Sequence, residues 1–423
     1  MPSKPDDSLP QTGGEGIARL VINGKFLAPS TSRSGVHRVA HEMLVALDAV
    51  LVENPALARA ISCRVVVPAG QDNKLQLSRI RFESDDTSIA MSPLRRKVRG
   101  VLWEQLALPR RAKGDTLISL CNIGPVSHRN AFTMVHDAQV YSSPDSYSLA
   151  FRTWYRFILP LLGKRNRGLL TVSGYSRQQL DRFGVAVAAR ISVVHNGCDH
   201  VLRLVPSAAK VESSGLAGTH YVVALANSQP HKNVAVLLKA FQLPELRDVT
   251  LALFGSAKRE DFERQGHVVP SNVQFLGFVS DEELAGLLQQ ATALAFPSTT
   301  EGFGLPPLEA MALGCPTVVA PCGALREVCG DAPLWAEPHD PIEWATQISK
   351  LFKGDAVRAN VQRLGLAQAA KFTWKKAAHR LLEVVIGKSL ADSGLLQAVP
   401  EPNVTRRPLV VSARTRPITQ PLL

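Results

Sequence analysis

Short runs of apolar, mostly β-branched residues recur along the first half of the chain, and most of them end in turn-forming residues. Because their apolar character is continuous rather than alternating, we expect strands that are buried on both faces, as in a parallel sheet covered by helices. Stretches with helical character separate most of the runs. The expected strands lie at residues 18–24, 63–69, 116–120, 131–137, 168–173 and 191–197.

The second half repeats this pattern more clearly. The start of one helix is marked by Ser280 with Glu283 three residues later, and another by Asp340 followed by Pro341 and Glu343; both are typical of capping boxes. The expected strands of this half lie at residues 221–227, 249–255, 273–279, 293–297, 316–321 and 333–337.

Residues 205–220 interrupt the alternation of strands and helices with small and polar residues, which indicates a domain boundary. We therefore predict an α/β protein with two Rossmann-like, doubly wound domains, at residues 18–206 and 207–370. Such domains bind ligands at the carboxyl ends of their strands. The chemistry is expected in loops that follow strands, in a cleft between the two domains.

The composition is that of a folded protein: 423 residues, 45% hydrophobic, with a formal net charge of +12. Residues 1–17 lack the apolar core of a signal sequence, and no segment reaches the ~18 consecutive apolar residues that span a bilayer. We therefore expect a cytoplasmic protein. Residues 1–17 and the basic, proline-containing residues 391–423 are predicted to be disordered tails.

The positive charge favours a nucleic acid or an anionic membrane as partner. Residues 94–113 carry seven Lys and Arg side chains, with Trp103 and several leucines between them. We predict an interfacial helix here, at the inner face of an anionic membrane; the alternative is a solvated helix whose Trp103 and leucines belong to the core. The chain has no recognised nucleic-acid-binding motif, so we expect no nucleic-acid partner.

Six cysteines lie mostly in apolar runs and form no CxxC pair, which predicts buried, reduced thiols without a metal. They are Cys63, Cys121, Cys198, Cys315, Cys322 and Cys329.

The segment PSTTEGFGLPPLEAMALGCP, residues 297–316, places Glu301 and Glu309 on either side of a glycine- and proline-rich turn. Glu301 is expected on a loop at the cleft and Glu309 early in the helix behind it. The backbone amides of residues 302–305, at a helix N-terminus, are suited to a phosphate or to sugar hydroxyls. The alternative is that Glu309 only complements the helix dipole and the glycines only make a tight loop.

The stretch EGFGLPPLEAMALGCPTVVA resembles the signature of the retaining family 4 glycosyltransferases, in which seven residues separate two glutamates; these enzymes have the GT-B fold. LANSQPHKNVAVLLKAF (225–241), VQFLGFVSDEEL (273–284), TVSGYSRQQL (171–180) and VVHNGCD (193–199) resemble further landmarks of that family. KFTWKKAAHRLLEVV (371–385) resembles its closing helix, which implies that residues 371–390 cross back to the first domain. The resemblance covers residues 18–387.

The resemblance implies roles for particular residues. Glu309 would hold the ribose of a nucleotide-sugar donor, Glu301 would lie beside the transferred sugar, and Lys232 would bind the diphosphate and offset the charge of the leaving group. His231 stands where the family commonly has arginine, and Ala226 replaces a loop glycine, so the phosphate contacts would depend more on Lys232.

On the acceptor side, Gly35 resembles a glycine that lets the backbone approach the diphosphate or the acceptor. His136 resembles a histidine that touches the donor sugar; the alternative is a satisfied histidine at a strand end. The predicted catalytic residues are thus Glu301, Lys232 and His136. The predicted donor-binding residues are Glu309, Gly302, Phe303, Gly304, Leu305, Gly35, His231 and Asn227.

No DxD triplet occurs in the chain, so we expect transfer without a metal or other cofactor. Retention of configuration, implied by the resemblance, would let the departing phosphate oxygen accept the proton of the incoming hydroxyl. Residues 136–147 and 99–109 resemble bacterial members that build exopolysaccharide or O-antigen, which favours a mannosyl donor and a saccharide or lipid-linked acceptor. The alternatives are a nucleotide-sugar epimerase of the same fold and a non-catalytic scaffold.

Overall fold

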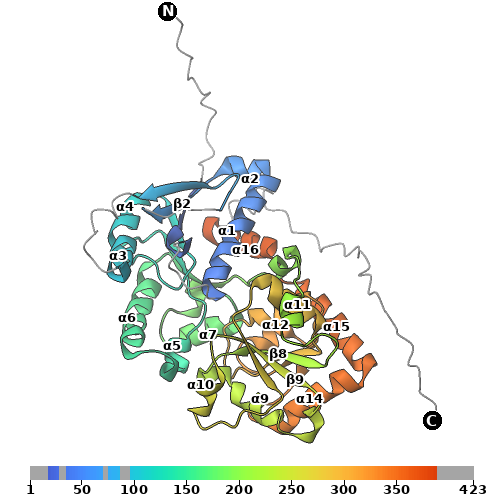
Figure 1. Ribbon diagram of the computed structural model, residues 1–423. Helices are drawn as coiled ribbons and strands as arrows, with labels where there is room; N and C mark the ends of the chain where they lie inside the picture. The colour runs from blue at the N-terminus through green and yellow to red at the C-terminus, as the bar shows by residue number, and fades with distance from the viewer. Residues whose placement is uncertain (1–17, 28–34, 70–74, 86–95, 388–423) are drawn as a thin grey trace, which may run out of the picture.

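The computed structural model describes residues 18–27, 35–69, 75–85 and 96–387 (Figure 1). The chain forms two α/β domains, each built on one parallel sheet. The first sheet has seven strands in the order β3-β2-β1-β4-β5-β6-β7, and the second has six in the order β10-β9-β8-β11-β12-β13. The predicted tails at residues 1–17 and 391–423 lie outside the described residues.

The first sheet consists of β1 (Ala18–Asn23), β2 (Ile61–Pro68), β3 (Arg81–Asp85), β4 (Thr116–Ser119), β5 (Ala131–Met134), β6 (Gly168–Thr171) and β7 (Ile191–Val193). Its helices are α1 (Gly35–Glu53), α2 (Pro55–Ala60), α3 (Arg96–Leu102), the π-helix η3 (Trp103–Ala107), α4 (Leu108–Arg111), α5 (Gln139–Ser142), α6 (Leu149–Arg165) and α7 (Gly174–Arg182). Short 3-10 turns are η1 (Gly24–Leu27), η4 (Pro144–Ser146), η5 (Ala188–Arg190) and η6 (Asp199–Arg203).

The second sheet consists of β8 (Tyr221–Ala226), β9 (Thr250–Gly255), β10 (Val273–Gly277), β11 (Ala293–Phe296), β12 (Thr317–Val319) and β13 (Leu334–Trp335). Its helices are α8 (Ala209–Ser213), α9 (Val234–Ala240), α10 (Arg259–Glu263), α11 (Asp281–Gln290), α12 (Leu305–Ala312), α13 (Leu325–Cys329), α14 (Pro341–Lys353) and α15 (Asp355–Ala369). The turns η7 (Pro230–Lys232) and η8 (Pro244–Leu246) complete it.

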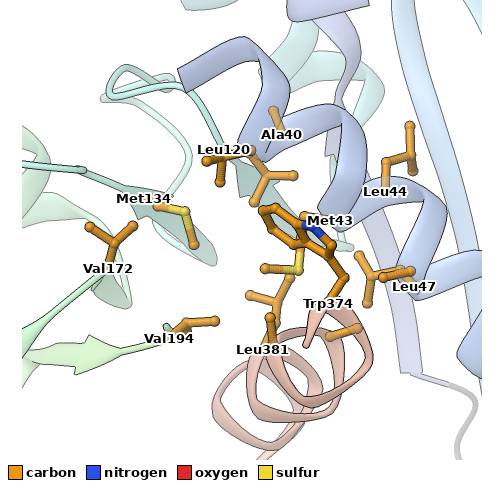
Figure 2. Packing of buried hydrophobic residues seen from close by; sticks show 14 of the residues in the cluster. Ala40, Met43, Leu44, Leu47, Leu120, Met134, Val172, Val194, Trp374 and Leu381 are labelled. Atoms are coloured by element: carbon orange, nitrogen blue, oxygen red, sulfur yellow. The ribbon is translucent and has the colours of Figure 1, made fainter. Parts of the chain in front are cut away.

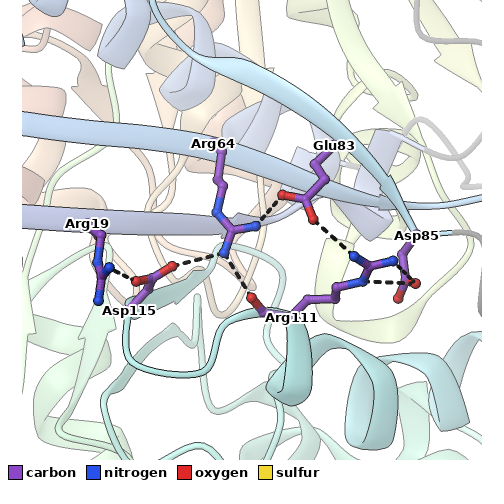
Figure 3. A network of polar contacts seen from close by, with 6 residues as sticks. All are labelled: Arg19, Arg64, Glu83, Asp85, Arg111 and Asp115. Atoms are coloured by element: carbon purple, nitrogen blue, oxygen red, sulfur yellow. Dashed lines mark hydrogen bonds and ion pairs between the residues drawn. The ribbon is translucent and has the colours of Figure 1, made fainter. Parts of the chain in front are cut away.

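All twelve predicted strands are present, because the runs that predicted them are buried between helices; Val21 and Ile22 of β1, for example, are fully buried. The additional strand, β3, was missed because its sequence RFESD is mostly polar. It lies at the edge of the first sheet, where polar side chains suit an exposed strand. Figure 3 shows how its acidic residues are bound: Glu83 pairs with Arg64, and Asp85 lies 3.3 Å from the guanidinium of Arg111.

The helix starts follow the predicted caps with one difference. Ser280 and Glu283 form the predicted capping box, with the Glu283 amide 3.1 Å from the Ser280 hydroxyl and the Ser280 amide 2.8 Å from the Glu283 carboxylate. Asp340 caps α14, but Glu343 accepts a hydrogen bond from the Glu337 amide rather than from Asp340. The Asp340 amide already donates to the Glu337 carbonyl, so the reciprocal bond has no donor.

The last described helix, α16 (Trp374–Ile386), packs against α1 of the first domain (Figures 1 and 2). Trp374 and Leu381 of α16 contact the face of α1 that carries Met43, Leu44 and Leu47, and all of these side chains are almost completely buried. The chain therefore returns to its first domain after completing the second.

The interpretation of residues 94–113 needs correction at Trp103. Its side chain is fully buried and its indole N–H donates to Asp85 at 2.8 Å, so the alternative reading, ordinary core, holds for this residue. Val98 and Leu106 are the apolar residues of this segment that are about half exposed, at 47% each. Residues 94 and 95 lie outside the described part. No helix among the described residues has the length and apolar character needed to cross a membrane.

Candidate active site

A cleft of about 740 Å³ lies between the two domains. Residues that follow strands of both sheets line it, as the sequence predicted for doubly wound domains. From the predicted site they include Gly35, His136, Asn227, His231, Lys232, Glu301, Gly302, Phe303, Gly304 and Leu305. Glu309 is not among the described residues that line the cleft.

The centre of the predicted site is an ion pair within the second domain. Lys232 ends η7, the turn after β8, and Glu301 lies on the loop between β11 and α12. The Lys232 Nζ atom is 2.7 Å from Glu301 Oε1, and the two side chains are 19% and 12% exposed. Asn233, in the left-handed region at φ 52°, donates to the carbonyls of Pro297 and Pro338 and fixes the turn that carries Lys232. Partial burial makes this attraction stronger than that of a surface pair.

The glycine-rich loop after Glu301 lies directly against the first domain. A side chain at Gly302 would bring a Cβ atom within 2.8 Å of both the Asp137 Cβ atom and the His136 carbonyl, so glycine is required at this approach. The Gly302 carbonyl accepts a 2.6 Å hydrogen bond from the Ser173 hydroxyl. Gly304, at φ 93°, then turns the chain into α12. The loop is thus held in one position by contacts from both domains.

His136 lies at the end of β5 with its Nε2 atom 2.8 Å from the Leu120 carbonyl, so Nε2 carries the proton and donates it. Burial lowers the pKa of His136 to about 4, although the bond to Leu120 opposes this shift. The imidazole is therefore neutral at physiological pH and lines the cleft. The neighbouring Asp137 accepts from the Gln139 amide, and burial raises its pKa.

His231 and Asn227 occupy the wall of the cleft beside Lys232. The His231 Nδ1 atom is 2.9 Å from the Ser146 hydroxyl of the first domain, and the His231 carbonyl accepts from the Thr299 amide. Burial, and then the charge of Lys232, lower the pKa of His231. Asn227 accepts from the backbone amide of Gln229. His231 therefore contacts the first domain as a neutral side chain, whereas an arginine at this position would be charged.

Glu309 lies apart from this group. It is 7% exposed, and its Oε1 atom is 3.0 Å from the His200 Nε2 atom and 3.6 Å from the Arg38 Nη1 atom. Arg38 also lies 2.5 Å from Asp281 of α11. The structure therefore brings Glu301 together with Lys232, whereas Glu309 of α12 faces Arg38 of α1 and His200 of η6 in the first domain.

A second polar cluster on the cleft wall was missed in the sequence. It consists of Asn23, Lys25 and Glu104, all of which line the cleft. The position of Asn23 at the end of a predicted strand was a usable signal for it and for Lys25. No signal in the sequence predicted that Glu104 lines the cleft, because the orientation of its side chain depends on the π-helix η3, which has no recognisable sequence pattern.

The remaining predictions about chemistry concern cysteines and metals. All six cysteines are free; Cys121 and Cys322 are half-buried and the other four are buried. Burial raises the pKa of the Cys63 thiol to about 12, which keeps it protonated. Among the described residues, no group of three or more His, Cys, Asp or Glu side chains is placed to hold a metal ion.

Comparison with known proteins gives the family. The model of the glycosyl transferases group 1 family matches residues 209–384. The chain is 31% identical to O-antigen chain mannosyltransferase B of Escherichia coli over 260 residues, which are 58% of this chain and 67% of that protein. The chain belongs to the glycosyl transferases group 1 family.

Further matches agree with this assignment of the chain as a glycosyltransferase. O-antigen chain mannosyltransferase RfbU of Salmonella typhimurium is 30% identical over 229 residues, 53% of this chain and 61% of that protein. The solved structure of HepE from Anabaena, in complex with UDP and glucose, is similar with a TM-score of 0.61 and 18% identity, over 87% of this chain and 99% of that one. This likeness concerns the fold, and it confirms the GT-B architecture of this glycosyltransferase.

Proposed function

We propose that this glycosyltransferase is a retaining enzyme of family 4 that moves a hexosyl group, with mannosyl as the leading candidate, from a nucleoside-diphosphate sugar to a saccharide or lipid-linked saccharide. The observation that carries the proposal is the Lys232–Glu301 pair at 2.7 Å in the cleft between the domains. A fixed ammonium suits a diphosphate, and a carboxylate beside it suits sugar hydroxyls. Glu301 of the sequence signature and Lys232 of the donor-domain loop thus lie together in the cleft, whereas Glu309 lies apart from them.

In this mechanism the bond between the sugar C1 atom and the diphosphate oxygen breaks while the acceptor oxygen bonds to C1 on the same face. The departing phosphate oxygen takes the acceptor's proton, so no side chain has to act as the base. Lys232 meets the negative charge that grows on the diphosphate, and such preorganised electrostatic help is commonly the largest contribution to catalysis. Glu301 orients the sugar, and the neutral His136 lies within the same cleft.

The reaction proceeds without a metal ion in this proposal. Lys232 supplies the positive charge that a metal supplies elsewhere, and the chain has no DxD triplet. Transfer rates should be the same in 5 mM EDTA, roughly the excess that removes trace divalent cations, and after addition of MgCl₂ or MnCl₂. A rate that EDTA abolishes and a divalent ion restores contradicts this part of the proposal.

The mannosyl preference is supported by the two O-antigen mannosyltransferases that are about 30% identical to this chain, whereas HepE was solved with UDP and glucose. A thermal-shift panel of GDP-mannose, UDP-glucose, UDP-galactose and UDP-N-acetylglucosamine tests the donor. A ligand at a hundredfold excess over its Kd stabilises the folded state by about 2.7 kcal/mol, which is easily measured. We expect GDP-mannose to give the largest shift. When the donor is incubated without an acceptor, we expect no second nucleotide sugar to form, whereas an epimerase would produce one.

A peripheral contact with an anionic membrane belongs to the same proposal, because a lipid-linked acceptor has to reach the cleft. In the described part of residues 94–113 the exposed large apolar residues are Val98 and Leu106, and Arg110, Arg111 and Lys113 are also exposed. Each basic residue near an anionic surface contributes about 1 kcal/mol. Liposome co-sedimentation should show stronger binding to vesicles with phosphatidylglycerol than to neutral ones, and Leu106→Glu should weaken it. Val268→Glu, at an exposed valine of the second domain, is the control; equal binding to both vesicles contradicts the contact.

A further inference from the structure

The wall of the cleft formed by the first domain contains a buried ionic cluster of its own. Glu104 is 3% exposed; its Oε1 atom accepts from the Asn23 side-chain amide at 2.7 Å, and its Oε2 atom lies 2.7 Å from Lys25 Nζ. Asn23 also donates to the Ser119 hydroxyl at 3.2 Å. Lys25 keeps 33% of its side chain exposed. The cluster therefore presents an ammonium and the edge of a carboxylate to the cleft.

The fold is built to hold these side chains in place. A Cβ atom at Gly24 would lie 2.6 Å from Val67 Cγ1, so only glycine lets the chain turn closely over β2 between Asn23 and Lys25. The stem of Lys25 then passes under α3, 3.4 Å from the position of a Cβ on Gly100. On the other side, the π-helix η3 allows Trp103 to enter the core while the next residue, Glu104, is also buried and lines the cleft. Single π-helical turns of this kind occur frequently at functional sites.

The cluster is separate from the Lys232–Glu301 pair, which belongs to the second domain. Tyr155 of α6 also lines the cleft. Burial raises the pKa of Tyr155, and the charges of Glu104 and then Asp137 raise it further, so both carboxylates are within electrostatic reach of its phenol. Asp137 in turn is influenced by Glu301 and Lys232. The cluster and the Lys232–Glu301 pair therefore line the same cleft, with Tyr155 close to charged groups of it.

We propose that Lys25 and Glu104 form the subsite that recognises the hydroxyl groups of a neutral acceptor sugar, with Asn23 as the residue that positions Glu104. The assignment rests on the proposed glycosyl transfer. A pyranose with neighbouring hydroxyls both donates and accepts hydrogen bonds, which matches a carboxylate beside an ammonium. Tyr155 and Phe151, whose rings stack at 4.1 Å, also line the cleft and supply an aromatic surface.

The pairing within the cluster suits a neutral sugar. Lys25 and Glu104 are bonded to each other at 2.7 Å, so together they offer a hydrogen-bond donor and an acceptor and carry no net charge. Hydrogen bonds to charged groups contribute more than neutral ones, so loss of either partner should be costly to acceptor binding.

The test uses the full-length chain, the donor that gives the largest thermal shift, and four neutral acceptors: the octyl glycosides of mannose, glucose, galactose and N-acetylglucosamine. The variants are Glu104→Gln, Lys25→Met and the double variant, which leaves no unpaired buried charge. Glu83→Gln is the matched control, because Glu83 is in an ionic network on the edge strand β3, outside the described lining of the cleft (Figure 3). Acceptor KM, donor KM and hydrolysis of the donor by water are measured for each.

We expect the acceptor KM to rise on the order of tenfold or more in each cluster variant, as for a lost hydrogen bond to a charged group. In the cluster variants, donor KM and donor hydrolysis should stay within about twofold of wild type. In the Glu83→Gln control, acceptor KM, donor KM and donor hydrolysis should all stay within about twofold of wild type. The double variant should lose less than the product of the two single losses, since both act on one group of hydroxyls.

Three results overturn the subsite. One is an unchanged acceptor KM in folded variants, and another is an equal rise of acceptor and donor KM. The third is a wild-type enzyme that binds and hydrolyses the donor but transfers to none of the four glycosides. A wild type that binds no nucleotide sugar is a different failure, because it contradicts the proposed function itself.

Discussion

The two glutamates of one sequence motif have different surroundings. Glu301 pairs with Lys232 of its own domain, inside the cleft. Glu309 lies near His200 of η6 and Arg38 of α1, which places its contacts between the domains and outside the described lining of the cleft. The difference shows that spacing in a motif fixes neither the partner nor the accessibility of each residue. The first contact survives any movement of the domains relative to each other, whereas the second depends on their docking.

The hydrogen bonds of His200 sharpen this contrast. Its Nδ1 atom accepts from the Trp374 indole N–H at 3.1 Å, and an indole nitrogen is a donor only. The Nε2 atom therefore carries a proton and faces Glu309 at 3.0 Å, although neither of these two buried atoms makes a well-aligned hydrogen bond among the described residues. Glu309 thus keeps the capacity to accept a further hydrogen bond, which is what a ribose hydroxyl would supply.

The largest effect is expected for the pair within the cleft. Lys232→Ala should lower kcat roughly a hundredfold or more, the cost of losing a preorganised group that stabilises developing charge. Lys239→Ala, at an exposed lysine of α9, is the control and should retain full activity. Steady-state kinetics with circular dichroism as a check on folding measure both. A fully active Lys232→Ala enzyme removes the diphosphate-binding role.

The second prediction addresses the other glutamate. If Glu309 accepts hydrogen bonds from the ribose, the contact is equal in ground and transition states, so Glu309→Ala should mainly raise the donor KM. It should also lower the free energy of unfolding by about 1–3 kcal/mol, because Arg38 and His200 lose a buried partner. Urea denaturation beside the kinetics separates the two effects. A loss of stability with unchanged kinetics leaves Glu309 as a docking residue only.

The sequence predicted the fold well because central strands of parallel sheets are apolar on both faces and therefore stand out as continuous runs. It failed for β3, whose polar side chains are satisfied by Arg64 and Arg111 from distant segments. Neither partner is near β3 in the chain, so no local pattern reveals the pairing. The same reason explains the incorrect capping box at Glu343, where a backbone amide outside the helix provided the better donor.

The candidate site was predictable where it follows directly from a strand end or a glycine loop. Lys232, Glu301 and the glycines after it lie in the cleft because parallel strands present their carboxyl ends to one edge. The surroundings of Glu309 were not predictable, since they depend on how two domains dock through Arg38 and His200. Glu104 was hidden for a different reason, because one π-helical turn changes the phase of its helix.

The third prediction removes a partner of Glu309 and leaves the carboxylate itself. Arg38→Ala should lower the free energy of unfolding by about 1 kcal/mol or more, since Arg38 is close to both Glu309 and Asp281 and connects α1 with the second domain. The donor KM should change less than in Glu309→Ala. If the two variants have the same donor KM, the effect of Glu309 comes from domain docking and not from the ribose.

The smallest effect is expected at a second contact between the domains, where Glu327 of α13 accepts from the amides of Gly174 and Tyr175 and lies 2.9 Å from His195 Nε2. Burial works to raise the pKa of Glu327, but the hydrogen bonds from His195, Gly174 and Tyr175 outweigh it, and the pKa is lowered from its ordinary value of 4.5. A carboxylate with a lowered pKa stabilises the folded state above its ordinary pKa, and this stabilisation is lost as the pH falls through the folded value.

Glu327→Gln should therefore have a slightly lower Tm than wild type at pH 7, and the difference should shrink as the pH falls below about 4.5. The effect is small because a third of the Glu327 side chain is exposed and solvent weakens the interaction. Asp331→Asn, at an exposed carboxylate just after α13, serves as the control and should follow wild type at every pH. A Tm difference that stays constant down to pH 3.5, roughly a unit below the ordinary pKa, means that the ionised carboxylate does not stabilise this contact between the domains.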